Sequence, residues 1–156
     1  MISLDADDWL PDPEVFARVM AAYADQDTWI TYGSYVCSNG EMVFNAPLKD
    51  AAEIRNVEWR TSHLRTWKLW LWNKIRPTDF LDRHGAPLRC AGDVAWMMAM
   101  IEMAGNLHSK WLPDCNYVYN RDNPESCGKI RRDEQFANAA WIRSLPRYSE
   151  VTHPHA

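Results

Sequence analysis

The sequence predicts an α/β fold, because segments with strand patterns alternate with segments of helical spacing. Residues 29–36 are rich in aromatic and β-branched side chains, which favours a strand. Asn39-Gly40 then supplies a tight turn, after which residues 42–44 pair back as a hairpin. Residues 94–104 are rich in methionine and end at Gly105, which predicts a helix packed in the core and closed by a glycine.

One strand and two helices are predicted elsewhere in the first half of the chain. Residues 1–5 alternate apolar and polar side chains, which predicts a strand that ends in an acid. Asp12 caps the next helix, with Pro13 at its first position, and the apolar residues that follow have helical spacing. Residues 62–75 are predicted to form one amphipathic helix, entered from a short extended segment and stopped at residue 77, a proline.

Three further elements complete the chain. Residues 88–91 are predicted to be extended, and residues 116–120 to form a strand. Residues 129–145 are predicted to form a final helix closed by Pro146. Only one helix precedes the hairpin, so the pattern resembles part of a larger sheet. We expect one domain over residues 1–151 and a disordered tail at 152–156.

The composition narrows the class of protein. The net charge is −4, which does not favour a non-specific nucleic-acid binder. The longest apolar stretch, residues 94–103, contains Glu102 and is far too short to span a bilayer. No basic segment followed by an apolar one opens the chain, so a cytoplasmic location is expected. The four cysteines show no C-x-x-C spacing, which predicts reduced thiols packed as small apolar groups.

The chain contains nine tryptophans, which is several times ordinary usage. Tryptophan stacks on the apolar faces of sugars and bases, but it is also a common large core residue. Trp9 and Trp59 are the candidates that we single out for contact with a sugar.

Three acids, Asp5, Asp7 and Asp8, follow the first predicted strand. In an extended backbone Asp5 and Asp7 project to the same side. Clustered carboxylates repel one another, and their hard oxygens suit Mg²⁺ or Mn²⁺, particularly a metal that also binds a diphosphate. An EF-hand loop or a haloacid dehalogenase phosphatase would require other residues where Trp9 and Leu10 stand. An acidic loop that caps the next helix remains the alternative, although Asp12 already fills that role.

The segment from Leu4 to Leu10 resembles the D-x-D region of family 2 glycosyltransferases with the GT-A fold. Later segments resemble, in order, one bacterial and viral branch of that family. These segments are Thr31-Tyr32-Gly33-Ser34-Tyr35, Ser62-His63-Leu64-Arg65-Thr66, Asp93 ahead of Ile101-Glu102-Met103-Ala104-Gly105, Tyr117-Val118-Tyr119-Asn120 and Asn123-Pro124.

The resemblance implies a role for each acid. Asp5, Asp7 and Asp8 would hold Mn²⁺ or Mg²⁺ against the diphosphate of a nucleotide-sugar donor, with Asp7 the first candidate for direct ligation. Asp93 matches the carboxylate that takes a proton from the acceptor hydroxyl in an inverting transfer. Gly92 stands where many relatives carry a second acid. The alternative for Asp93 is that it only caps its helix.

His63 and Arg65 stand where the family brings a segment under the donor sugar, which implies contact with sugar or phosphate. The alternative is a histidine satisfied in the core and an arginine on the surface. Glu102 lies about half a helical turn out of phase with Asp93, so we expect it to be structural.

The resemblance also implies a partial GT-A fold, with a mixed sheet flanked by helices and the N-terminal nucleotide-binding segment absent. The first strand would then lie exposed, with an unpaired neighbour position. The implied partners are a nucleotide sugar (a UDP-sugar first), a carbohydrate or other hydroxyl acceptor, and either a second copy of the chain or a missing N-terminal segment. The alternative function is a non-catalytic remnant or carbohydrate-binding module. Four explanations for the absent N-terminal segment remain open. They are a mis-set start codon, a split enzyme, a fragment, and a minimal enzyme that works as a dimer.

Overall fold

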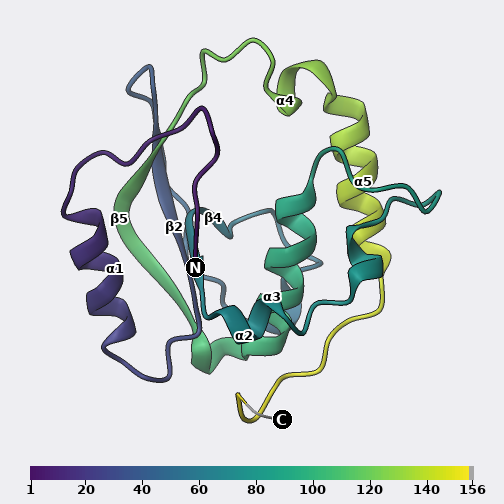
Figure 1. The fold of residues 1–156 in the computed structure, drawn as a ribbon, viewed down its shortest axis with the longest axis horizontal. Helices are drawn as coiled ribbons and strands as arrows, with labels where there is room; N and C mark the ends of the chain where they lie inside the picture. Colours follow the sequence, from purple (N-terminus) through teal and green to yellow (C-terminus); the bar gives the residue numbers. More distant parts are fainter. Residues whose placement is uncertain (155–156) are drawn as a thin grey trace.

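The computed structural model describes residues 1–154 as an α/β fold, in which helices flank a five-stranded mixed sheet (Figure 1). The predicted fold class is thereby confirmed at this level. Of the tail predicted at 152–156, residues 155–156 lie outside the described residues. The elements are β1 (Ile2–Ser3), α1 (Val15–Tyr23), β2 (Ile30–Cys37), β3 (Met42–Val43), η1 (Ala51–Glu53), β4 (Ser62–Trp67), α2 (Leu69–Trp72), η2 (Pro77–Phe80), α3 (Gly92–His108), β5 (Ser109–Tyr119), α4 (Cys127–Ile130) and α5 (Arg132–Ser144).

Strand β2 lies at the centre of the sheet. It pairs antiparallel with β4 through its first half and with β3 near its end, and it pairs parallel with β5 along its whole length. The predicted hairpin between β2 and β3 is confirmed, and Gly40 in its turn has a positive φ of 86° that favours glycine. Strand β5 begins at Ser109, several residues earlier than predicted.

Helices cover both faces of the sheet (Figure 1). Helix α1 packs on one face through Val15 and Val19, which join Leu64 and Tyr117 in a small apolar cluster. The larger core lies on the other face around α3, whose residues from 95 to 104 are all buried. A helix buried on every side needs apolar residues all round, which explains its methionine-rich sequence.

The ends of the later helices follow from local backbone. Gly105 leaves the helical conformation (φ 61°, ψ −170°), so the helix is interrupted at the position where its end was predicted, but α3 continues beyond this kink to His108. The single helix predicted for 129–145 is wrong, because Arg131 (φ −134°, ψ 32°) separates α4 from α5.

The helix predicted for 62–75 is also wrong. Residues 62–67 form β4, between β1 and β2, and only the four residues of α2 are helical after it. Every residue of β4 is buried, with Leu64 in the cluster beneath α1 and Trp67 in the core around α3. Because both faces of β4 are buried, its sequence lacks the alternation of apolar and polar residues that identifies a half-exposed strand. The helical spacing of its apolar residues was therefore a coincidence.

Strand β1 lies at one end of the sheet and pairs only with β4 among the described strands. Its residue Ile2 is 38% exposed and the following Leu4 is 47% exposed. The expectation of an exposed first strand is therefore confirmed. Within residues 1–154, no helix has both the length and the apolar character needed to cross a bilayer.

Candidate functional site

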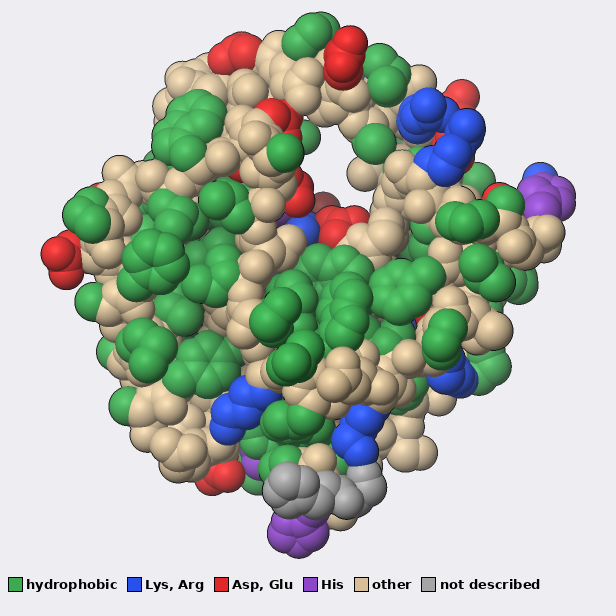
Figure 2. Space-filling view, in the orientation of Figure 1, with side chains coloured by type: hydrophobic (Ala, Val, Ile, Leu, Met, Phe, Trp, Pro, Cys, Tyr) green, Lys and Arg blue, Asp and Glu red, His purple; other side chains and the backbone are tan. Residues whose placement is uncertain are grey.

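A cavity of about 610 Å³ opens where the loop after β1, strand β4 and the start of α3 meet. Figure 2 shows an opening at this place in the upper half of the molecule, with acidic and basic side chains at its lower edge. Six of the eight residues singled out from the sequence line this cavity. They are Asp5, Asp7, Trp59, His63, Arg65 and Asp93.

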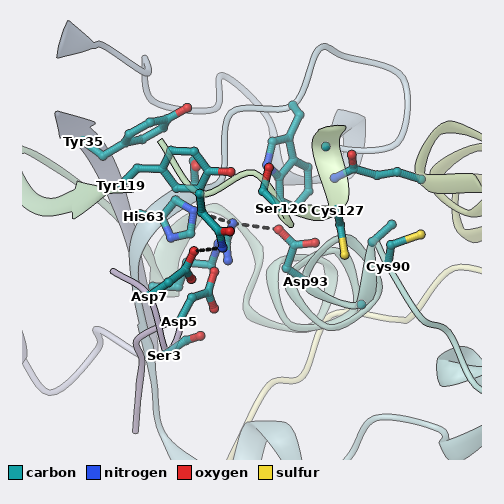
Figure 3. Close-up of a pocket in the computed structure, with 18 of the residues that line it drawn as sticks. Ser3, Asp5, Asp7, Tyr35, His63, Cys90, Asp93, Tyr119, Ser126 and Cys127 are labelled. Carbon is teal, nitrogen blue, oxygen red and sulfur yellow. Dashed lines mark hydrogen bonds and ion pairs between the residues drawn. The ribbon is translucent and has the colours of Figure 1, made fainter. Parts of the chain in front are cut away.

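Asp5 and Asp7 reach the cavity from the loop that follows β1. Figure 3 shows them on one side of the cavity and Asp93 on the other. The Oδ2 atom of Asp7 accepts a hydrogen bond of 2.5 Å from Nδ2 of Asn123. Burial raises the pKa of Asp5, and the carboxylates of Asp8, Asp93 and Asp7 add to this effect while Arg65 opposes it. A bound cation would relieve this crowding of negative charge.

Asp8 has a different environment and does not line the cavity. Its side chain is buried, with Oδ2 accepting from the hydroxyl of Tyr117 (2.6 Å) and Oδ1 accepting from the backbone N–H of Asn120 (2.7 Å). Burial and this hydrogen bond raise the pKa of Tyr117. Both oxygens of Asp8 therefore tie the acidic loop to the end of β5, which separates its role from that of Asp5 and Asp7.

Arg65 and Asp93 form an ion pair on the floor of the cavity. Nη2 of Arg65 lies 2.7 Å from Oδ2 of Asp93 and 3.3 Å from Nε2 of His63. The Arg65 side chain is 3% exposed and its guanidinium lies over the ring of Trp96, so the alternative of an arginine on the surface is wrong. The Asp93 side chain is 34% exposed and remains accessible from the cavity.

His63 is a neutral residue in this setting. Burial and the charge of Arg65 lower its pKa from 6.5 to about 2. Arginine can only donate, so Nε2 accepts and the ring proton lies on Nδ1. The ring stacks on Tyr117 with a centroid separation of 4.1 Å and meets the edge of Tyr35 at 5.4 Å. Nδ1 of His63 and Nε of Arg65 are both buried and have no hydrogen-bond partner among the described residues.

The start of α3 presents Asp93 through an unusual backbone. Ala91 has a left-handed conformation (φ 61°, ψ 18°), which is uncommon for a residue with a Cβ atom. The chain then enters the helix at Gly92, so Asp93 lies in its first turn, where the helix dipole favours a carboxylate. Oδ1 of Asp93 accepts from the N–H of Val94 (3.0 Å) within this first turn, and the side chain faces the cavity; the N-cap position itself is held by Ala91 without a side-chain hydrogen bond.

Trp59 and Trp9, the two candidates for contact with a sugar, differ in their position relative to the cavity. Trp59 is half-buried, packs against the main core and lines the cavity. Trp9 is 46% exposed and pairs with Val118 through its backbone, and it is not part of the cavity lining. Of the two candidates for sugar contact, the structure brings only Trp59 to the site.

Several lining residues received no role from the sequence. Tyr35 and Tyr119 form an aromatic wall beside His63, and Asn123 holds Asp7. Tyr35, Tyr119 and Asn123 lie in segments that resemble family 2 glycosyltransferases. Their position in these segments was the signal in the sequence that could have identified them. Ser126 and Cys127 also line the cavity, at the start of α4, where no pattern pointed to them.

Residues 1–154 contain no group of three or more His, Cys, Asp or Glu side chains placed to hold a metal ion. No protein-family model matches the chain, and no curated protein matches it either. Membership of family 2 glycosyltransferases therefore stays a prediction from the sequence resemblance.

Proposed function

We propose that the protein is a metal-dependent inverting glycosyltransferase of the GT-A type, which transfers a sugar from a nucleotide-diphosphate donor to a hydroxyl acceptor. A UDP-sugar is the first candidate for the donor. One observation carries the proposal: the acidic pair Asp5 and Asp7 and the separate carboxylate Asp93 open onto the same cavity. Such a reaction requires an anion-binding centre for the leaving diphosphate and a base for the acceptor. The mixed sheet flanked by helices is compatible with this fold family.

The residues fit a divalent metal that is shared with the donor. Asp5 and Asp7 offer carboxylate oxygens to the cavity, whereas Asp8 uses both of its oxygens inside the protein. Mg²⁺ and Mn²⁺ commonly take one or two protein carboxylates and complete their shell with water and phosphate oxygens. When bound, the metal would supply positive charge that stabilises the departing diphosphate.

Asp93 is the proposed base. Its carboxylate is accessible from the cavity and would accept the proton of the acceptor hydroxyl. Arg65 holds Oδ2 of Asp93 and so fixes the direction of the carboxylate, while His63 in turn contacts the guanidinium. His63 remains neutral throughout the physiological pH range, so it orients its neighbours without adding charge.

A thermal melt of the purified chain tests the donor site. Mn²⁺ together with UDP should raise the melting temperature, because a ligand that binds the native state stabilises it by mass action. Mn²⁺ alone or UDP alone should raise it less. A cooperative melt that does not move with both ligands present would count against the proposal.

Asp93→Asn tests the reaction itself. The amide keeps the size of the side chain and can still accept from Arg65, but it cannot take a proton. Transfer should fall by about 10²–10⁴-fold while the melting shift with Mn²⁺ and UDP remains. Asp133→Asn, at an exposed acid in the first turn of α5, is the matched control and should keep wild-type transfer. A carbohydrate-binding module would instead bind sugar equally well with and without the Asp93 carboxylate.

A further inference from the structure

A second cavity, of about 360 Å³, lies beside the first and beneath the hairpin of β2 and β3. The two cavities share Tyr35, Trp59 and Ser62, so a ligand can extend from one into the other without leaving the surface. The other lining residues of the second cavity are Val43, Phe44, Asn45, Ala46, Glu58 and Arg60.

Aromatic side chains form much of this second surface. Phe44 is 71% exposed, so burial in the core does not account for an aromatic residue there. Trp59 is half-buried and held against the main core, and Tyr35 is held edge-on against His63 and Tyr119. Fixed aromatic rings of this kind offer apolar faces to the C–H groups of a pyranose ring.

Two charged groups in the second cavity have no partner in the protein. Glu58 and Arg60 make no hydrogen bond or ion pair with any residue from 1 to 154. Arg55, in the same segment, makes four side-chain hydrogen bonds. A half-buried guanidinium and a carboxylate that are both unpaired can bond the hydroxyl groups of a ligand, and their opposite charges favour a neutral one.

The wall of the second cavity is preformed. Asn45 donates from its side chain to the carbonyl of Gly33 (2.8 Å) and from its backbone to Oγ of Ser34 (3.0 Å). These bonds fix the segment that follows β3 against β2, so Phe44 is presented on an anchored chain. Preorganisation of this kind lowers the entropy cost of binding.

We propose that this second cavity, the acceptor groove formed by Tyr35, Phe44, Glu58, Trp59 and Arg60, binds a neutral oligosaccharide acceptor. This inference rests on the proposed function, because it assigns the reacting hydroxyl to the first cavity, beside Asp93. The terminal sugar then lies in the first cavity against Trp59, and the next sugar units extend into the acceptor groove. An acceptor of at least two sugar units is required to contact Phe44 and Arg60.

Saturation-transfer NMR on the full chain tests the acceptor groove, with maltotriose, chitotriose and mannotriose as probes. At least one of these trisaccharides should receive saturation from the wild-type protein. Phe44→Ala and Arg60→Gln should each weaken that binding at least fivefold. Phe136→Ala is the matched control, because Phe136 on α5 is 62% exposed and lies outside both cavities. The melting temperature of each variant verifies that it remains folded.

The melting shift with Mn²⁺ and UDP separates this proposal from the proposed function. If the wild-type protein shows that shift but binds none of the three trisaccharides, the acceptor groove is wrong and the transferase proposal stands. An equal loss of trisaccharide binding in Phe44→Ala and Phe136→Ala would also contradict the proposed acceptor groove. If a trisaccharide binds and Phe44→Ala abolishes its binding, but Mn²⁺ and UDP give no shift, the saccharide site stands and the transferase proposal fails.

Discussion

Nη2 of Arg65 lies 2.7 Å from Oδ2 of Asp93, although Arg65 belongs to strand β4 and Asp93 to the first turn of α3. The arginine is almost completely buried and the carboxylate is not. The ion pair therefore joins a buried strand to a carboxylate at the cavity surface, and it sets the direction in which Asp93 faces.

Arg65→Lys should reduce turnover more than it reduces donor binding. Lysine keeps the positive charge but lacks the planar guanidinium whose Nη2 atom contacts both Asp93 and His63. Misplacement of the base by about 1 Å can lower the rate roughly 10²-fold, so kcat should fall by about that factor. Steady-state kinetics with varied donor should show little change in the donor KM. The expectation fails if KM rises while kcat is retained, which would assign Arg65 to donor binding instead.

Asp7 and Asp8 are adjacent in sequence, yet their substitution should have opposite consequences. Asp8→Ala leaves the Tyr117 hydroxyl and the Asn120 N–H without their acceptor, at a cost of about 1–3 kcal/mol for each buried group. Asp7 is exposed, and among residues 1–154 its side chain bonds only Asn123, so Asp7→Ala should change the free energy of unfolding by less than about 1 kcal/mol.

Urea denaturation measures the stability of both variants, and thermal melts with Mn²⁺ and UDP measure donor binding. Asp7→Ala should lose the ligand-induced shift while remaining as stable as the wild type. Each variant is the control for the other. A variant Asp7→Ala that keeps the full shift would remove Asp7 from the metal site.

The contrast between Asp7 and Asp8 shows what the sequence could not predict. The cluster of acids was a local pattern, and the loop that carries it lines the cavity with Asp5 and Asp7. Which of the three acids faces inward depends on Tyr117 and Asn120, which β5 brings from the far end of the chain. Contacts of this kind have no local pattern.

The same dependence on distant contacts explains why the segment of β4 was wrongly predicted to be helical. The hairpin and the break in α3 were predictable because Asn39-Gly40 and Gly105 impose a backbone conformation by themselves. Strand β4 instead buries the polar residues His63 and Arg65, which line the cavity, so it lacks the usual alternation. The residues that line the cavity thus obscured the pattern of the strand that carries them.

His63 should make the fold sensitive to acid. Its pKa is lowered to about 2 in the native state, while the unfolded chain takes up a proton near 6.5. Between these values the unfolded state binds more protons, so stability is fully present above pH 6.5 and is lost as the pH falls. The slope contributed by one such group is at most about 1.4 kcal/mol per pH unit.

Urea denaturation between pH 7.5 and 5 checks this dependence. His63→Gln keeps an acceptor for Arg65 but cannot be protonated, so its stability should fall less steeply with pH than that of the wild type. His84→Gln, at an exposed histidine, should follow the wild-type curve. Parallel curves for the wild type and His63→Gln would contradict the assignment of a buried neutral histidine.

The ion pair of Arg55 and Glu102 should be the most sensitive structural contact outside the cavity. Their side chains are 4% and 2% exposed, and two hydrogen bonds of 2.5 and 2.9 Å join them. Arg55 also donates to the carbonyls of Ile142 and Leu145 at the end of α5. The pair therefore fastens α3 and α5 to the segment that follows η1, in agreement with the structural role expected for Glu102.

Glu102→Gln leaves the Arg55 charge buried without its counter-ion, and it should lower the free energy of unfolding by about 3–5 kcal/mol. Glu134→Gln is the control, because its partner Arg89 is 63% exposed and such surface pairs contribute only about 0.2–1 kcal/mol. Replacement of both members, Arg55→Met with Glu102→Met, should cost less than Glu102→Gln alone, because no unpaired charge remains. Urea denaturation of the three proteins measures these differences. If Glu102→Gln is no more costly than Glu134→Gln, the buried pair does not hold the two helices together.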